Sequence, residues 1–152
     1  MAAAIARAAR QLTETSDIQL RLRLAPAATD FHPDIEYDLL RIVQEAIANA
    51  IKHSGAGVIE VTMRCDQRTL TISVRDDGAG FESRRHLEQN EPGHYGLIGM
   101  RERATQVGAE IDWESEPKAG TTVTIRRPLS PSRSSSADPQ HSRRVEPEEL
   151  SL

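Results

Sequence analysis

Three polar residues, Glu45, Asn49 and Lys52, stand at positions i, i+4 and i+7 of one segment. In an α-helix this spacing places them on one face, with His53 at its edge. A carboxylate, an amide oxygen and a cation are the groups that a metal-bound triphosphate requires, because Mg²⁺ takes hard oxygen ligands and keeps several waters. A carboxylate one turn away can also orient a water or an incoming nucleophile. A solvated polar helix face would show the same residues, so this segment alone leaves both interpretations open.

A second candidate segment is DDGAGF at residues 76–81, directly after a predicted strand. Two aspartates that leave a strand into glycines place fixed carboxylates beside a flexible turn. The Asp76 carboxylate can accept a hydrogen bond from an exocyclic amine such as that of adenine. Gly78 and Gly80 would let a planar ring approach the backbone. The alternative is an ordinary Asp-Gly turn.

A third candidate segment is the glycine-rich GHYGLIGM at residues 93–100, which runs into a predicted helix. Backbone amides at a helix start point outward, and the helix dipole favours an anion such as phosphate. Glycine loops are common, so an ordinary loop is again the alternative. The chain lacks the GxxxxGK[ST] pattern of a P-loop, and its GxxGxxG spacing does not fit a Rossmann fingerprint. A nucleotide would therefore be bound by some other fold.

Hydrophobic periodicity predicts the elements that must position these segments. We expect helices at 1–13, 33–53 (closed by Gly55) and 97–107, strands at 17–24, 59–65, 70–75, 110–116 and 121–127, and an irregular stretch at 82–95. The short polar connection at 66–68 predicts an antiparallel hairpin. This element order favours an α+β fold in which helices are layered on one face of a mixed sheet.

Composition bounds the class of protein. The 152-residue chain has a net charge of −4 and is 38% hydrophobic, which suits one globular domain without a basic field for nucleic acid or a membrane surface. The single cysteine, Cys65, excludes an intramolecular disulfide and is expected in the core. The first residues form neither a secretory signal nor a membrane span, so we predict a cytoplasmic domain without direct membrane contact. Residues 130–152, rich in Ser, Pro and charge, are predicted to be a disordered tail, with a linker or docking segment as the alternative.

Taken together, the three segments resemble the N, G1 and G2 boxes of the histidine-kinase, topoisomerase and chaperone ATPase superfamily. The strings RIVQEAIANAIKHSGA, DDGAGF, GLIGMRERATQVGA and GTTVTIRRPL are most similar to two-component sensor histidine kinases of the NarL-partner class. The resemblance covers roughly residues 18–129. It implies the Bergerat-type ATP-binding fold, a two-layer α/β sandwich, for residues 17–129. Two departures, at residues 108–109 and 117–120, are expected to alter turn geometry and not the pocket.

The resemblance implies roles for individual residues. Asn49 would hold Mg²⁺, Glu45 would position the attacking group, and Lys52 and His53 would lie near the phosphates of ATP. Asp76 would bind the adenine amine, and residues 82–95 would form a lid. Further nucleotide contacts or hinges are implied at Gly78, Gly80, Gly96, Leu97, Gly99 and Thr121. Arg101 and Arg103 could meet phosphate or lie on the helix surface, paired with Glu102 or solvent.

The function implied is phosphoryl transfer from Mg-ATP to a histidine on a separate domain or chain. None of the five histidines has the acidic, helical setting of the phosphoacceptor, so the expected partners are a dimerisation and phosphoacceptor domain and, indirectly, a response regulator. Residues 1–16 could be the end of the dimerisation helix, and a membrane anchor is left open for the full kinase. Two alternatives remain: a protein-serine kinase of the anti-sigma type, and a non-enzymatic module that senses ATP by lid closure.

Overall fold

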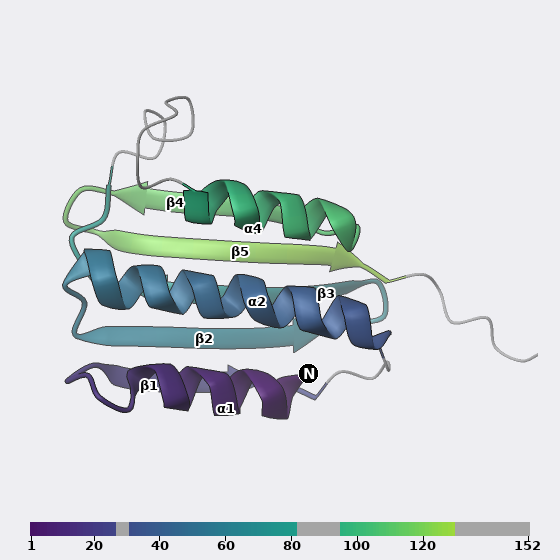
Figure 1. The fold of residues 1–152 in the computed structure, drawn as a ribbon, viewed down its shortest axis with the longest axis horizontal. Helices are drawn as coiled ribbons and strands as arrows, with labels where there is room; N and C mark the ends of the chain where they lie inside the picture. Colours follow the sequence, from purple (N-terminus) through teal and green to yellow (C-terminus); the bar gives the residue numbers. More distant parts are fainter. Residues whose placement is uncertain (27–30, 82–94, 130–152) are drawn as a thin grey trace, which may run out of the picture.

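The computed structural model describes residues 1–26, 31–81 and 95–129 of the chain. The predicted tail and nearly all of the predicted lid lie outside the described residues. In chain order, the described residues form α1 (Ala2–Thr13), β1 (Gln19–Leu24), α2 (Pro33–Asn49), η1 (Ala50–Ser54), β2 (Val58–Cys65), β3 (Thr69–Asp76), α4 (Tyr95–Gln106), β4 (Glu110–Glu116) and β5 (Gly120–Pro128) (Figure 1).

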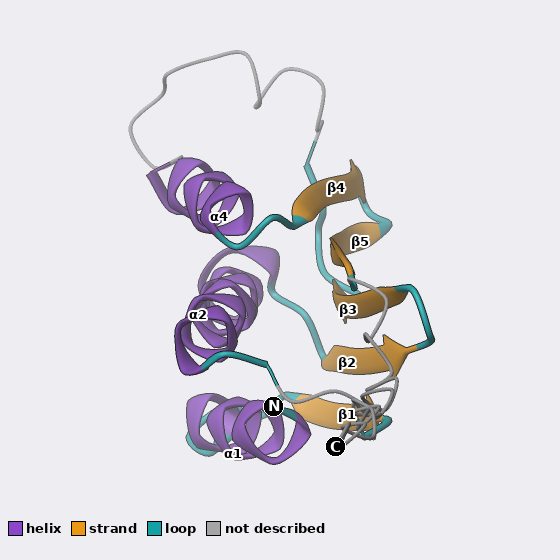
Figure 2. Ribbon diagram, turned by 90° about the vertical axis from the view of Figure 1, so that its right-hand side faces the viewer, coloured by secondary structure: helices purple, strands orange, loops and turns teal. Residues whose placement is uncertain are grey.

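The strands form one mixed sheet in the order β1-β2-β3-β5-β4. β1 pairs with β2 in parallel, and the other neighbours pair antiparallel, so β2–β3 is the predicted hairpin. Figure 2 shows α1, α2 and α4 side by side on the same face of the sheet. The predicted α+β sandwich is confirmed. Among the described residues, no helix has the length and apolar character needed to cross a bilayer.

The core lies between the helices and the inner face of the sheet. Strand alternation turns one set of side chains inward, and one cross-strand row consists of Val61, Val74, Val123 and Trp113. All four are buried, as are Ile47 and its apolar neighbours along α2. Burying a side chain of this size stabilises the fold by about 2 kcal/mol relative to leaving it exposed.

Helix α1 belongs to this core. Ile5 and Ala9 are fully buried in the same apolar cluster as α2 and the sheet. The amino group of Met1 forms an ion pair with Glu36 of α2, at 3.0 Å. The core therefore extends across the domain boundary predicted at residue 16. Helix α1 lies in the same helix layer as α2 and α4 (Figure 2). A continuation of α1 into a dimerisation helix stays a prediction.

The long helix differs from expectation in its last turn. The sequence predicts one α-helix through His53, but α2 ends at Asn49 and continues as the π-helical turn η1. Gly55 then closes it in the left-handed conformation, with φ 62°, as predicted. Ser54, the last residue of this wider turn, is held by a contact that is distant in sequence. Its carbonyl accepts a hydrogen bond from Ala79 N–H at 2.7 Å, which ties the helix end to the turn after β3.

The turn between β2 and β3 is held by Asp66. Its Oδ1 accepts hydrogen bonds from the backbone N–H groups of Arg68 (2.7 Å) and Thr69 (2.8 Å). These bonds, first that of Arg68 and then that of Thr69, lower the pKa of the Asp66 carboxyl below its ordinary value. The charged form is therefore favoured in the folded chain.

Asp66→Ala is expected to destabilise the chain at neutral pH and to matter less in acid. Because the folded-state pKa is lowered, the stabilisation is present above the unfolded-state value of about 3.9 and is lost as pH falls through the folded-state value. Urea unfolding of the parent and the variant between pH 7 and pH 3 measures this, with Asp66→Asn as a control that keeps the acceptor oxygen without the charge. A parent–variant difference that stays constant over the whole range would contradict the assignment.

Candidate functional site

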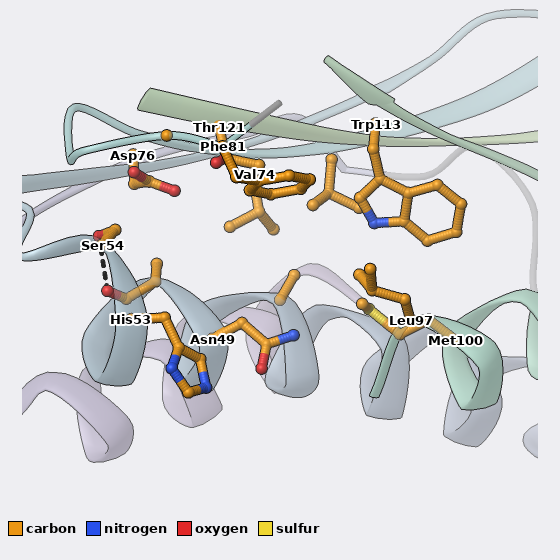
Figure 3. Close-up of a pocket in the computed structure, with 14 residues that line it drawn as sticks. Asn49, His53, Ser54, Val74, Asp76, Phe81, Leu97, Met100, Trp113 and Thr121 are labelled. Atoms are coloured by element: carbon orange, nitrogen blue, oxygen red, sulfur yellow. Dashed lines mark hydrogen bonds between the residues drawn. The ribbon is translucent and has the colours of Figure 1, made fainter. Parts of the chain in front are cut away.

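A cavity of about 360 Å³ lies between the sheet and the helices. Its size is in the range of small-molecule sites. Figure 3 shows two facing rows of side chains, one from the sheet and one from the helices. The sheet side consists of Val74, Asp76, Gly80, Phe81, Trp113, Thr121 and Val123, and the helix side of Ala46, Asn49, Ala50, His53, Ser54, Leu97 and Met100.

Asp76 is the buried carboxylate of this cavity. It ends β3 and is only 6% exposed. Its Oδ1 accepts a hydrogen bond from Gly78 N–H at 2.9 Å. Within the described part of the chain, Oδ2 accepts no hydrogen bond, and Figure 3 shows the carboxylate at one end of the cavity. A carboxylate oxygen that is free to accept, on an otherwise buried residue, suits a ligand that carries an N–H or O–H group.

Asp77 has a different task from its neighbour. Its Oδ1 accepts hydrogen bonds from Gly57 N–H (2.9 Å) and Val58 N–H (2.8 Å), where β2 begins. The side chain is exposed and does not line the cavity. The two adjacent aspartates therefore divide into one that faces the cavity and one that fixes the start of β2.

The glycines after β3 allow close backbone contacts. A Cβ atom on Gly78 would overlap Ser54, whose backbone binds this turn, and Gly78 does not line the cavity. Gly80 does line it, and its φ of 61° together with the nearby Glu116 carbonyl leaves no room for a side chain. Gly80 thus contributes to the cavity wall, whereas the absence of a side chain at Gly78 lets η1 pack against the turn.

The side-chain hydroxyls of Thr121 and Ser115 form a pair beside Asp76. Thr121 is the cross-strand neighbour of Asp76 on β5. The two hydroxyl oxygens, Ser115 Oγ and Thr121 Oγ1, lie 2.9 Å apart. Ser115 Oγ also accepts a hydrogen bond from Phe81 N–H at 2.8 Å, which anchors the chain as it leaves the DDGAGF segment. Only Thr121 of this group was predicted as a site residue.

The helix face is split by the π-helical turn. Asn49 and His53 line the cavity and Lys52 does not, although His53 and Lys52 are both exposed residues. In η1 the backbone bonds span one residue more than in an α-helix, so the chain turns less per residue after Asn49. His53, four residues after Asn49, therefore stays in the cavity lining, whereas Lys52 lies outside it. Glu45 lies on the same side of the helix but outside the cavity lining.

At the start of α4, Gly96 lies against Glu45, and a Cβ atom there would come within 2.6 Å of Glu45 Oε1. Leu97 lines the cavity. Gly99 has open space around it, and no contact explains its lack of a side chain. Helix α4 begins at Tyr95, two residues before the predicted start. The absence of a side chain at Gly96 avoids an overlap with Glu45 at this point.

The two arginines of α4 have defined partners. Arg103 Nη1 lies 3.1 Å from Asp38 Oδ1 of α2, and the guanidinium of Arg101 lies 5.3 Å from the ring centroid of Trp113. Their contacts are therefore with Asp38 and Trp113 and not with Glu102. Because α4 carries Leu97 and Met100 into the cavity, the Arg103 pair helps to fix that part of the wall.

Several residues that line the cavity were not predicted as site residues, namely Ala46, Ala50, Ser54, Val74, Phe81, Met100, Trp113 and Val123. Strand alternation identifies Val74, Trp113 and Val123 as inward-facing. It does not reveal that these side chains face a cavity and not a helix. Phe81 carries a signal, since it ends the DDGAGF segment. Ser54 carries none, because its place depends on the π-helical turn.

Comparison with known proteins places this geometry in a family. A family model described as histidine kinase-, DNA gyrase B- and HSP90-like ATPase matches residues 34–131. The chain belongs to this ATPase family. The sensor protein VraS of Staphylococcus epidermidis is 38% identical over 104 residues, which are 68% of this chain and 29% of VraS. VraS of Staphylococcus haemolyticus is 40% identical over 95 residues, which are 62% of this chain and 26% of VraS.

The family fold is also seen in solved structures. The histidine kinase domain of the blue-light activated kinase of Erythrobacter litoralis EL346 superposes with a TM-score of 0.70 at 22% identity, covering 84% of this chain and 60% of that one. The ATP binding domain of PrrB from Mycobacterium tuberculosis gives 0.64 at 25% identity, covering 83% and 91%. The ATPase-family chain described here spans less than a third of the length of the curated VraS proteins, with 29% and 26% covered.

Proposed function

We propose that this chain is the Mg-ATP-binding catalytic domain of a sensor histidine kinase. The observation that carries the proposal is the cavity in which buried Asp76 lies opposite the Asn49 face of α2, inside a fold of the ATPase family. The relatives of known description are sensor proteins, which supports a kinase over the other members of that family. The NarL-partner class rests on the resemblance of the sequence strings, among them GLIGMRERA.

Adenine suits the Asp76 end of the cavity. Its exocyclic amine is a donor for Oδ2, and the Thr121 hydroxyl lies on the neighbouring strand. Apolar side chains, among them Val74 and Leu97, cover the faces of a planar ring. The cavity thus offers the mixture of apolar walls and a few placed polar groups that is typical of cofactor sites.

The phosphates and the metal are assigned to the helix side. Asn49 would hold Mg²⁺ through its amide oxygen, and one protein ligand suffices because Mg²⁺ keeps waters and binds phosphate oxygens. His53 lies beside Asn49 in the lining. Lys52 is exposed, so we assign it a contact from outside the cavity. Glu45, next to Gly96 at the start of α4, is assigned to orient the attacking group, and Gly99 to let the neighbouring lid close.

The proposed reaction moves the γ-phosphoryl group from ATP to an imidazole nitrogen of a histidine on another domain or chain, leaving ADP. In such a transfer the protein contributes mostly positioning and charge stabilisation. The expected partners are the dimerisation and phosphoacceptor domain and, after it, a response regulator. We place the domain on the cytoplasmic side, where ATP is available.

Asn49→Ala tests the catalytic assignment. The chain is incubated with Mg²⁺, ATP labelled at the γ-phosphate, and a separately expressed dimerisation domain, for which that of S. epidermidis VraS is chosen as the source. We expect acid-labile label on the acceptor histidine, lowered by the variant on the order of 100-fold because a charge-stabilising group is lost. Asp77→Asn, outside the cavity, is the control and should retain transfer. Acid-stable label on serine would favour the protein-serine kinase and contradict the histidine-kinase assignment. A chain that binds ATP but labels nothing would contradict the kinase function itself.

A further inference from the structure

Trp113, the only tryptophan of the chain, carries a buried hydrogen-bond donor that the folded domain does not use. The residue is 5% exposed, and the described residues offer no acceptor for its Nε1–H. Indole nitrogen is a donor only, and buried donors are nearly always satisfied. Strand β5, which pairs with β4 at the edge of the sheet, provides no partner because it places the apolar Val123 opposite Trp113.

This donor lies in the candidate site. Trp113 lines the same cavity as Asp76, Asn49 and Thr121. Figure 3 shows the nitrogen-bearing edge of the indole turned toward the part of the cavity where Asn49 and Asp76 lie, with the six-membered ring on the opposite side. The N–H group therefore points toward the space that an acceptor of a bound ligand would occupy (Figure 3).

The indole is held in this orientation from several sides. The Arg101 guanidinium lies over the ring, 5.3 Å from its centroid. Trp113 also belongs to the buried cluster that contains Met100 and Val123. A ring fixed in this way keeps its donor aimed without a ligand, so little rotamer entropy is lost on binding.

We infer that Trp113 Nε1–H donates a hydrogen bond to an uncharged acceptor of the bound nucleoside, either a purine ring nitrogen or a ribose oxygen. The cavity then has a carboxylate acceptor at the Asp76 end and an N–H donor at the Trp113 side. Adenosine carries the complement, an exocyclic amine together with ring-nitrogen and ribose acceptors. Trp113 is thus a specificity residue, and the inference rests on the proposed function.

The direct readout is the indole N–H signal of ¹⁵N-labelled protein, which is unambiguous because the chain has one tryptophan. Adding Mg-ATP is expected to move this signal downfield and to slow its exchange with solvent. In calorimetry, Trp113→Phe should bind ATP about fivefold more weakly, as one net hydrogen bond is worth about 1 kcal/mol. Urea unfolding of the variant checks that it is folded.

The ligand series separates the donor from simple packing. Adenine, adenosine, and adenosines in which a ring nitrogen is replaced by carbon are titrated into parent and variant. If the acceptor is a ring nitrogen, adenine already shows the loss, and one carbon analogue loses affinity for the parent but no further affinity for the variant. If it is a ribose oxygen, only adenosine shows the loss.

Two results would overturn the inference. One is an indole signal that stays unchanged when the parent binds ATP, and the other is an equal loss for every ligand in the variant, which would mean packing alone. In both cases the parent still binds ATP, so the proposed function stands. A folded parent that does not bind ATP at all would remove both proposals.

Discussion

Asp76→Asn is expected to weaken ATP binding by about 2 kcal/mol, or roughly thirtyfold, because a hydrogen bond to a charged acceptor is lost. The asparagine amide would also present a donor toward the adenine amine, which is itself a donor. Asp76 Oδ1 already accepts from Gly78 N–H, so the loss falls on the oxygen that faces the cavity. Calorimetric titration of Mg-ATP into the variant measures the effect.

Asp77→Asn is the matched control for this experiment. The residue is adjacent and carries the same charge, yet its carboxylate binds the backbone of Gly57 and Val58 outside the cavity. We expect this variant to lose some stability and to keep its ATP affinity. Equal weakening by both variants would mean that net charge, and not the Asp76 contact, determines binding.

Gly120→Ala is expected to lower the free energy of unfolding by about 3 kcal/mol, from left-handed backbone strain and from overpacking. Gly120 has φ 81°, and a Cβ atom there would overlap the backbone carbonyl of Asp76. Neither backbone can move easily, since β3 and β5 are paired at this point. Urea unfolding followed by Trp113 fluorescence measures the change.

Gly108→Ala supplies the comparison. Gly108 has φ 64°, but nothing lies within 4 Å of its would-be Cβ. Only the strain is then added, about 1 kcal/mol. If Gly120→Ala costs no more than Gly108→Ala, the close approach of Gly120 to Asp76 does not constrain the site. If Gly120→Ala remains folded, weaker ATP binding is also expected, because Asp76 would be displaced.

The fold could be predicted from sequence because local and tertiary signals agree. Alternation identifies all five strands, and the inward faces of β3, β5 and β4 meet in the row of Val74, Val123 and Trp113. The division of labour between Asp76 and Asp77 was also within reach. Asp76 shares the parity of Val74 on β3 and must therefore face inward, whereas Asp77 lies beyond the strand.

What periodicity could not provide is the geometry set by contacts distant in sequence. Of the predicted Lys52 and His53, only His53 lines the cavity after the π-helical turn, whose last residue, Ser54, contacts the turn at Gly78 and Ala79. Likewise, strand alternation predicts that Trp113 is buried. It does not predict that the Nε1–H donor of Trp113 has no partner among the described residues of the folded domain or that the residue lines a cavity.

The central claim is that this cavity binds ATP, and titration of Mg-ATP into the unmodified chain by calorimetry tests it most directly. The account predicts saturable binding with one site per chain, accompanied by a change in the fluorescence of Trp113, which lines the cavity. No heat and no fluorescence change at millimolar Mg-ATP, from a chain shown to be folded by urea unfolding, would contradict it. The site and the kinase function would then both have to be withdrawn for this chain.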